Sequence, residues 1–373
     1  MNPPRGTAPQ TGAQRSESLK IWLRRIGWTA LVVVALVAIF MFDFLRHGGQ
    51  FKTLEPHFAG SCTVMPLDAS SEDIQIDRAR GLAYLSWLDR RGQVEGKPVL
   101  GTVMLLDLNL PDARPRPALA SDPPRFRPHG MSLYRAGDGS QRLFVISHPA
   151  GGDQVVEIFE QTATGAFAPV RSVRDPLLLD PNAIVATGPE QFYVANDSGA
   201  TSAFGKATEL LFRRGLSKVV YFDGRRMRAV ASGLKSASGI AMSPDGSRLY
   251  VAETSGNRIS VFARNAASGD LALLERVELG SAADNINVDA DGSVWIAAHA
   301  KVLALGMHFG NPANLAPTQI FRFLPGAKGD ARLVEIYLDD GRQISAGSVG
   351  AVFDKQLLIG SITERKVLRC RLP

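Results

Sequence analysis

Short segments of alternating hydrophobic and polar residues fill the chain after about residue 60. The stretch 238–253 shows the unit most clearly: an alternating segment at 239–243, the turn Pro-Asp-Gly at 244–246, and a second alternating segment at 248–253. Alternation is the pattern of a half-buried β-strand, and Pro, Asp and Gly supply the backbone angles of a tight turn. The stretch therefore predicts a β-hairpin.

This hairpin recurs along the chain. First strands are expected at 73–77, 129–133, 182–186, 239–243, 285–289 and, more loosely, 348–352. Second strands are expected at 81–86, 142–147, 191–196, 248–253, 293–298 and 355–360. Six copies spaced roughly 45 to 62 residues apart match the blades of a propeller and exceed most solenoid repeats. We therefore predict an all-β protein, a six-bladed β-propeller over residues 60–373.

One segment near the N-terminus is uniformly apolar instead. Residues 26–42 carry no charged side chain, and three basic residues stand just before them. About 17 residues is the short end of a membrane span and longer than most signal-peptide cores, and no small-residue cleavage site follows. We expect a transmembrane signal anchor at 26–44 after a disordered basic leader at 1–25; the alternatives are a cleaved signal and a buried core helix.

The basic flank also predicts the orientation. Positive residues stay on the cytoplasmic side of a membrane, so we expect a single-pass protein with a cytoplasmic N-terminus and an extracytoplasmic propeller. The net charge of +6 belongs mostly to this segment: residues 1–50 hold six Lys or Arg against two acids, leaving 36 basic and 34 acidic side chains for residues 51–373. Because basic and acidic side chains are nearly equal in number in the propeller, its charge gives no support to nucleic-acid binding.

The two cysteines, Cys62 and Cys370, stand at the two ends of the predicted propeller. A propeller closes its ring by joining its first and last strands in one blade, which would place these sulfurs side by side. A disulfide there would contribute on the order of 4–5 kcal/mol in the chain-entropy model, and it requires an oxidising compartment. The alternative is two unrelated buried thiols.

Polar side chains stand where the predicted first strands begin. The first strands of a propeller line its central channel, so these residues converge at one mouth. Five of the six starts carry an oxygen-bearing or imidazole side chain, at Glu72-Asp73, His129, Asn182, Ser238 and Asp284-Asn285. Hard oxygen ligands of this kind suit Ca²⁺ and suit zinc poorly. The alternative is that Asn, Asp and Ser simply satisfy free backbone groups at strand starts.

These residues carry a resemblance to the paraoxonase/arylesterase family of six-bladed, calcium-dependent lactonases. The matching sequence motifs include Ser71-Glu-Asp73, Pro128-His-Gly-Met-Ser132, Ser147-His-Pro149, Gly188-Pro-Glu-Gln-Phe-Tyr193 with Asn196-Asp197, Ser243-Pro-Asp-Gly246 and Asp284-Asn-Ile286. The similarity runs from about Cys62 to Cys370. The chain has no Gly-x-Ser-x-Gly elbow, so a serine nucleophile is not expected.

The resemblance implies a catalytic calcium held by Glu72, Asn182, Asp284 and Asn285. A fifth ligand in the family is Asn, and Ser238 stands at that position with a shorter, weaker oxygen donor. The family's second calcium uses the positions of Asp73, the backbone carbonyl of Met131, and an Asp that is Ala183 here. With one carboxylate missing, the second site is expected to be weak or empty.

The resemblance also implies that His129 and His148 are the family's histidine pair. Histidine titrates nearest neutrality, so His129, assisted by His148, is expected to activate the attacking water; a purely structural role is the alternative for both. His299 is expected either to position substrate or to be structural. The remaining histidines, His47, His57 and His308, are expected at the surface or in local contacts.

The sequence thus predicts a membrane-anchored, calcium-dependent hydrolase of small esters or lactones, of the arylesterase or lactonase type. One rival is a non-catalytic or weakly active propeller that binds a protein or small ligand, which the departures at Ser238 and Ala183 keep open. Another is a propeller hydrolase with a different substrate, such as a sugar lactone. Two segments, 204–218 and 301–317, are expected as short helices or loops near the mouth.

Overall fold

The computed structural model describes residues 12–151, 154–326 and 331–373. The chain divides into two compact units, an N-terminal segment that ends at His47 and a second unit, Gly48–Pro373.

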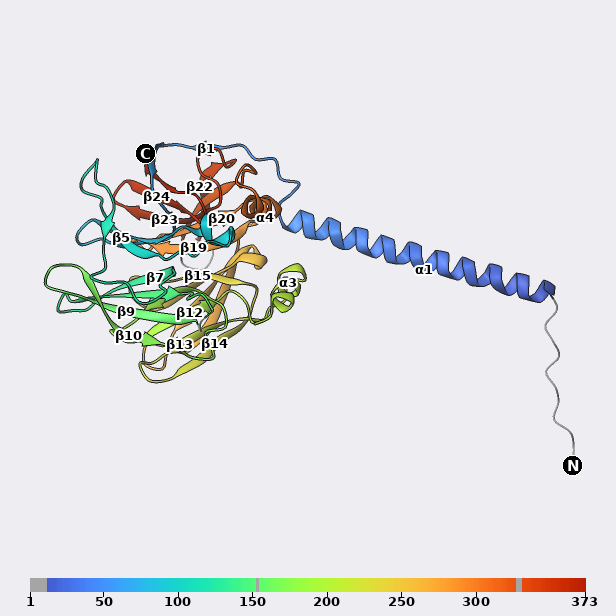
Figure 1. Ribbon diagram of the computed structural model, residues 1–373, viewed down its shortest axis with the longest axis horizontal. Helices are drawn as coiled ribbons and strands as arrows, with labels where there is room; N and C mark the ends of the chain where they lie inside the picture. Colours follow the sequence, from blue (N-terminus) through green and yellow to red (C-terminus); the bar gives the residue numbers. More distant parts are fainter. Residues whose placement is uncertain (1–11, 152–153, 327–330) are drawn as a thin grey trace, which may run out of the picture. The chain divides into compact units, whose positions relative to one another are not determined.

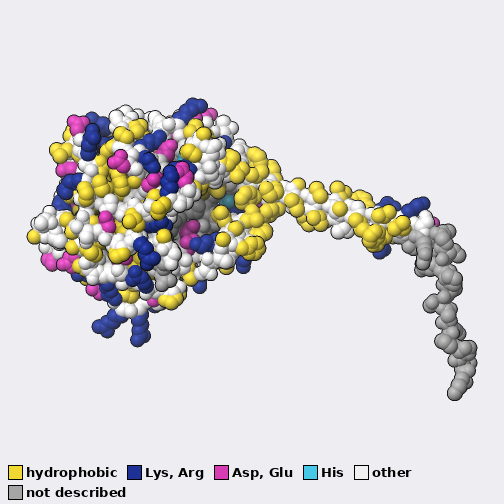
Figure 2. All heavy atoms as spheres, in the orientation of Figure 1, with side chains coloured by type: hydrophobic (Ala, Val, Ile, Leu, Met, Phe, Trp, Pro, Cys, Tyr) yellow, Lys and Arg dark blue, Asp and Glu magenta, His cyan; other side chains and the backbone are white. Residues whose placement is uncertain are grey.

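The first unit is a single helix, α1 (Gly12–His47). Its part Leu19–His47 is long and apolar enough to cross a membrane, and none of the most apolar window is buried; hydrophobic side chains cover it in Figure 2. At 1.5 Å per residue, 29 residues span about 44 Å, more than the hydrocarbon thickness of a bilayer. The helix starts before the apolar run, so residues 12–25, expected to be disordered, are helical. Residues 1–11 of that leader lie outside the described residues.

The second unit is a six-bladed β-propeller, as predicted. Its described residues form six antiparallel sheets, one per blade (Figure 1). Blade 1 consists of β3 (Ser70–Asp77), β4 (Leu82–Leu88), β5 (Thr102–Asp107) and β6 (Arg116–Pro117). Blade 2 consists of β7 (Pro128–Arg135), β8 (Gln141–Ser147), β9 (Val155–Gln161) and β10 (Phe167–Val173). Blade 3 consists of β11 (Pro181–Ala186), β12 (Phe192–Asn196), β13 (Ser217–Phe222) and β14 (Met227–Leu234).

Blades 4 to 6 complete the ring. Blade 4 consists of β15 (Ala237–Met242), β16 (Arg248–Glu253), β17 (Arg258–Arg264) and β18 (Leu271–Glu278). Blade 5 consists of β19 (Ala282–Val288), β20 (Val294–His299), β21 (Thr318–Leu324) and β22 (Arg332–Asp339), and β1 (His57–Phe58) pairs with β22 at the edge of this blade. Blade 6 consists of β23 (Gly347–Phe353), β24 (Gln356–Ser361), β25 (Lys366–Arg371) and β2 (Ser61–Pro66). Between strands lie the helices α2 (Arg90–Val94), α3 (Ala203–Leu211) and α4 (Val302–Gly310) and a 3-10 turn, η1 (Thr254–Gly256).

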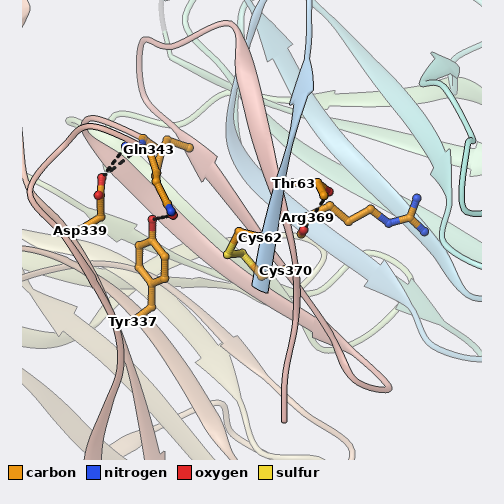
Figure 3. The surroundings of a disulfide bond; sticks show 8 residues. Cys62, Thr63, Tyr337, Asp339, Gln343, Arg369 and Cys370 are labelled. Carbon is orange, nitrogen blue, oxygen red and sulfur yellow. Dashed lines mark hydrogen bonds between the residues drawn. A yellow bond between two sulfur atoms is a disulfide. The ribbon is translucent and has the colours of Figure 1, made fainter. Parts of the chain in front are cut away.

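Blade 6 closes the ring by joining both ends of the propeller. The early strand β2 pairs with the final strand β25, and Cys62 lies directly opposite Cys370 in that ladder. The two cysteines form a disulfide across 308 residues of sequence (Figure 3). The predicted closure and pairing are therefore confirmed.

The hydrophobic core lies between neighbouring blades. Side chains of blade 2, such as Phe144 and Ile158, pack with side chains of blade 3, such as Phe192 and Val220. The rings of Phe144 and Phe192 lie 5.8 Å apart. Because each sheet is covered on both faces, middle strands read as continuous apolar runs such as Leu143–Ile146, all of them buried. This packing fixes the blades around the channel and holds the six inner strands together there.

Candidate functional site

Each inner strand is interrupted near its start by a β-bulge against the second strand of its blade. The register shifts fall at Ser71/Ile74, Pro128/Met131, Pro181/Ala183, Ala237/Gly239, Ala283/Ile286 and Gly347/Val349. The residues left unpaired in these bulges are Glu72, Asp73, His129, Gly130, Asn182, Ser238, Asp284, Asn285 and Ser348. A bulge re-aims a side chain and often lies beside an active site. Every polar residue predicted at a strand start lies in such a bulge. Ser348 lies in the sixth bulge and had not been predicted as a site residue.

Two glycines let the inner strands approach one another at this level. A Cβ atom added to Gly130 would lie 2.2 Å from the carbonyl oxygen of Asn182, and one added to Gly239 would lie 2.3 Å from that of Asp284. Real Cβ atoms do not approach backbone oxygens so closely, so neither position accommodates a side chain without a shift of the backbone. The bulges of adjacent blades therefore lie against each other.

Glu72 contacts residues of three other blades. Its Oε1 accepts a hydrogen bond of 2.7 Å from Asn285 Nδ2, and its backbone oxygen accepts one of 2.7 Å from the Ser348 hydroxyl. Its other carboxylate oxygen, Oε2, is buried and accepts no hydrogen bond from any described residue. That oxygen lies 3.4 Å from Nε2 of His129 and 3.9 Å from Nη2 of Arg90. The structure thus brings Glu72, His129 and Asn285 together and adds Arg90, which had not been predicted.

Three neighbouring side chains keep Glu72 ionised. Burial alone would raise its pKa, but the nearby His129 and Arg90 outweigh burial and, with the hydrogen bond from Asn285, lower the pKa of Glu72 to about 2. Arg90 is held in place by a hydrogen bond of 3.0 Å from its Nη2 to the carbonyl oxygen of Pro128. The centre of the ring therefore holds a carboxylate that stays charged at neutral pH.

The two predicted histidines form a pair. Nδ1 of His129 lies 2.7 Å from Nε2 of His148, and the rings meet edge to face with centroids 4.9 Å apart. Nδ1 of His148 in turn contacts the side-chain oxygen of Gln154. Burial, together with the adjacent His129, lowers the pKa of His148 to about 3, so this ring is neutral at pH 7.

Asp284 and Asn182 add two further oxygen-bearing side chains. Oδ2 of Asp284 lies 2.9 Å from Nε2 of His299, and both residues are buried. Burial raises the pKa of Asp284, and the contact with His299 opposes that rise. Oδ1 of Asn182 is buried with no hydrogen-bond partner in the described part of the chain. A buried acceptor without a donor is rare in folded proteins, so this oxygen is available to a bound ion.

Ser238 does not have this character. Its hydroxyl donates to the carbonyl oxygen of Ala283 at 3.1 Å and lies 2.7 Å from the hydroxyl of Thr254. The Ser238 side chain is thus engaged with blade 5, and its expected role as a fifth ligand has no support in these contacts.

Asp73 is enclosed by hydrogen-bond donors. Its Oδ1 accepts from the backbone N–H of Ile74 at 2.7 Å and its Oδ2 from that of Met131 at 2.6 Å, while Gln75 Nε2 lies 3.3 Å from both oxygens. Burial, followed by the negative charge of Glu72, raises the pKa of Asp73 to about 7 despite these donors. At Ala183, where a second carboxylate would be needed, there is only a methyl group. The residues present do not fit a second calcium.

The residues around Glu72 fit one calcium ion. Among the described residues, no group of three or more His, Cys, Asp and Glu side chains is placed so that it could by itself hold a metal ion. Calcium instead takes carboxylate and amide oxygens, and this ring offers two carboxylates and two amides, at Glu72, Asp284, Asn182 and Asn285. The free oxygens of Glu72 and Asn182 are the observation that supports the fit.

Other predicted residues fall outside this cluster. His308 is buried and not at the surface: its Nδ1 lies 2.7 Å from the backbone oxygen of Asn314 and its Nε2 lies 2.9 Å from the hydroxyl of Thr363. These contacts join the end of α4 to the segment that follows it and to the distant residue Thr363. Asp197, which the sequence singled out only as part of a motif, interacts electrostatically with Asp284 and His129 of the site. Burial raises the pKa of Asp197 to about 6, and the Ser236 hydroxyl donates a hydrogen bond of 2.7 Å to its Oδ1.

The fold and the bulge ring define a class: a six-bladed propeller whose channel mouth carries carboxylates, amides and a histidine pair. The chain belongs to the arylesterase family, whose model matches residues 56–372. It is 28% identical over 362 residues to serum paraoxonase/arylesterase 1 of Homo sapiens, covering 92% of this chain and 99% of that protein. It is 30% identical over 333 residues to serum paraoxonase/lactonase 3 of Mus musculus, covering 87% and 91%.

Solved propellers share the fold at much lower identity. A luciferin-regenerating enzyme superimposes with a TM-score of 0.51 at 11% identity, covering 84% of this chain and 95% of that one. This likeness concerns the fold alone.

Proposed function

We propose that the protein is a calcium-dependent hydrolase of small carboxylic esters or lactones. Membership of the arylesterase family supports the reaction class, since the relatives are named arylesterases and lactonases. The observation that carries the proposal is the free, buried Oε2 of Glu72, which lies 3.4 Å from the imidazole Nε2 of His129. A charged acceptor and a base converge there at the channel mouth.

Glu72, Asn182, Asp284 and Asn285 would hold the calcium ion. When bound, the ion supplies positive charge that polarises the substrate carbonyl and stabilises the oxyanion formed from it. For Asn285 this requires its amide to turn, because its Nδ2 now donates to Glu72. Asn182 already presents an oxygen without a donor.

His129 would be the general base. Its Nε2 faces Glu72, while its Nδ1 is occupied by His148, so Nε2 is the nitrogen that takes a proton from the attacking water. The same nitrogen then returns the proton to the leaving alkoxide, whether that group departs as an alcohol or stays attached after a lactone ring opens. His148, neutral and buried, holds the ring of His129 in place.

Helix α1 would anchor the hydrolase in a membrane with its N-terminus in the cytoplasm. Lys20, Arg24 and Arg25 flank the apolar run on its N-terminal side. The disulfide between Cys62 and Cys370 agrees with this orientation, because disulfides persist in extracytoplasmic, oxidising compartments.

The test is hydrolysis of phenyl acetate and of aliphatic lactones by the full chain in detergent, with calcium and after removal of calcium by EDTA. We expect turnover that disappears on chelation and returns when calcium is added back. Turnover unaffected by EDTA would overturn the calcium role. A complete lack of turnover by calcium-loaded protein would favour the rival, a propeller that binds a partner or ligand without catalysis.

A further inference from the structure

Gln154, just before β9, is the outermost member of a hydrogen-bonded chain that leads into the site. Its side-chain oxygen contacts Nδ1 of His148. The opposite nitrogen of that ring, Nε2, lies 2.7 Å from Nδ1 of His129. The far nitrogen of His129 then faces Oε2 of Glu72 at 3.4 Å. Gln154, His148, His129 and Glu72 thus form a single row of side chains.

The chemistry of an amide oxygen fixes the direction of the hydrogen bonds in this row. A carbonyl oxygen only accepts, so Nδ1 of His148 must carry the proton that it donates to Gln154. A neutral imidazole has one N–H, which leaves Nε2 of His148 as an acceptor. The proton between the two rings therefore sits on Nδ1 of His129, and the lone pair of a neutral His129 lies on Nε2, which faces Glu72.

The opposite arrangement would block the proposed reaction. With the proton of His148 on Nε2, that ring would donate to Nδ1 of His129, and the proton of a neutral His129 would move to Nε2. The nitrogen facing Glu72 would then be a donor and unable to accept a proton from water. Hydrogen bonding between the two rings alone permits both arrangements, and the amide oxygen of Gln154 distinguishes them.

We propose that Gln154 is a positioning residue that fixes the tautomers of His148 and His129, so that Nε2 of His129 is the free base atom. The catalytic consequence rests on the proposed hydrolase function, but the tautomers belong to the folded chain with or without substrate. The role resembles that of other groups that hold a working histidine in one tautomer through its second nitrogen. The neutrality of His148 is consistent with it.

The tautomer is directly measurable. The chain has six histidines, so full-length protein labelled with ¹⁵N-histidine in detergent gives few ring signals, and a His148→Asn variant assigns the one of interest. We expect His148 to show a protonated Nδ1 and an unprotonated Nε2. A Gln154→Glu variant keeps an acceptor and should show the same tautomer; Gln154→Met removes it and should show a mixture of tautomers or the Nε2–H form.

A kinetic measurement accompanies it. Gln154→Met should lower kcat on phenyl acetate roughly 10- to 100-fold, the range for outer partners of functional histidines, with KM nearly unchanged. Gln154→Glu should retain most of the wild-type kcat. The control, Gln191→Met, replaces an exposed glutamine in blade 3 and should leave both constants unchanged.

The outcomes separate this inference from the proposed function. A wild-type His148 protonated on Nε2, or a tautomer that does not change in Gln154→Met, overturns the role of Gln154 even if the protein is an active hydrolase. The expected tautomers in a protein without hydrolase activity support the inference and count against the function. Circular dichroism that matches wild type shows that a variant is folded.

Discussion

Glu72 and Asp73 are neighbouring carboxylates in the same bulge of β3, and their surroundings differ completely. Glu72 lies among a histidine, an arginine and an amide, with one oxygen free of hydrogen bonds. Asp73 has both oxygens occupied by the backbone N–H groups of Ile74 and Met131 and by Gln75. Both are buried, so burial does not explain the difference.

The difference shows how one strand provides a functional and a structural carboxylate. The bulge interrupts the ladder and re-aims the two neighbouring side chains into different surroundings. The Glu72 side chain lies beside His129, Arg90 and Asn285. The Asp73 side chain accepts hydrogen bonds from Ile74, Gln75 and Met131. The first carboxylate keeps one oxygen without a hydrogen bond and a pKa low enough to stay charged, whereas the second has hydrogen-bond donors on both oxygens and a raised pKa. We accordingly expect one calcium per chain, at Glu72.

The largest expected effect comes from Glu72→Gln. The amide removes the negative charge that would hold the ion, so we expect ester hydrolysis to fall at least about 100-fold, the scale of losing a main electrostatic group. Initial rates on phenyl acetate at saturating calcium measure it. Glu190→Gln, a change at an exposed salt bridge with Arg171, serves as the control. Near-normal activity of Glu72→Gln would remove this residue from the site.

Asp73→Asn should affect stability and not metal binding. Both oxygens of Asp73 accept from backbone N–H groups, so an NH₂ group in place of one oxygen faces a donor and costs about 1–3 kcal/mol. Denaturant unfolding measures the loss, and elemental analysis should still find one calcium per chain. Loss of that calcium, with Glu72 intact, would show that Asp73 is a ligand.

The pH dependence of stability should identify Asp73 in calcium-free protein. Its pKa is raised from 3.8 to about 7 by burial and by Glu72. Between these values the folded state binds more protons than the unfolded state, so the free energy of unfolding should fall as the pH rises through this window. Asp73→Asn lacks this contribution, so the stability advantage of wild type should shrink from pH 4 to 7. An advantage that stays constant or grows would contradict the assignment.

The smallest effect is expected at Ser238. Its hydroxyl donates to Ala283 of the neighbouring blade, so Ser238→Ala should lower the free energy of unfolding by about 1 kcal/mol, the worth of one hydrogen bond. Calcium affinity, measured by calorimetric titration, should stay within about twofold, because the Ser238 hydroxyl is not expected to bind the ion. For comparison, a tenfold change in Kd corresponds to about 1.4 kcal/mol of binding free energy. A much weaker affinity would restore Ser238 as a ligand.

Much of the fold followed from the sequence because its causes are local. Alternating residues and turn signals located every first and second strand of the blades, and the positions of Cys62 and Cys370 predicted the disulfide that closes the ring. The early start of α1 at Gly12 was missed because the polar residues before the apolar run carry no helical period.

The site was only partly predictable because its details depend on contacts between blades. The strand starts named Glu72 and its partners, but nothing in the sequence marks the bulges that re-aim them. Arg90 and Gln154 reach the site from outside the inner strands. No sequence feature distinguishes Ser348 from other serines in the predicted strands. The donors around Asp73 are the side chain of Gln75 and the backbone N–H groups of Ile74 and Met131, and backbone donors leave no signature in a sequence.

We propose that a single calcium ion at Glu72 makes this propeller a hydrolase. Calcium should be titrated into metal-free, full-length protein while bound metal and turnover of phenyl acetate are followed together. We expect turnover to rise in proportion to occupancy and to saturate at one ion per chain. Saturation at two ions, or full turnover before any calcium is bound, would contradict it.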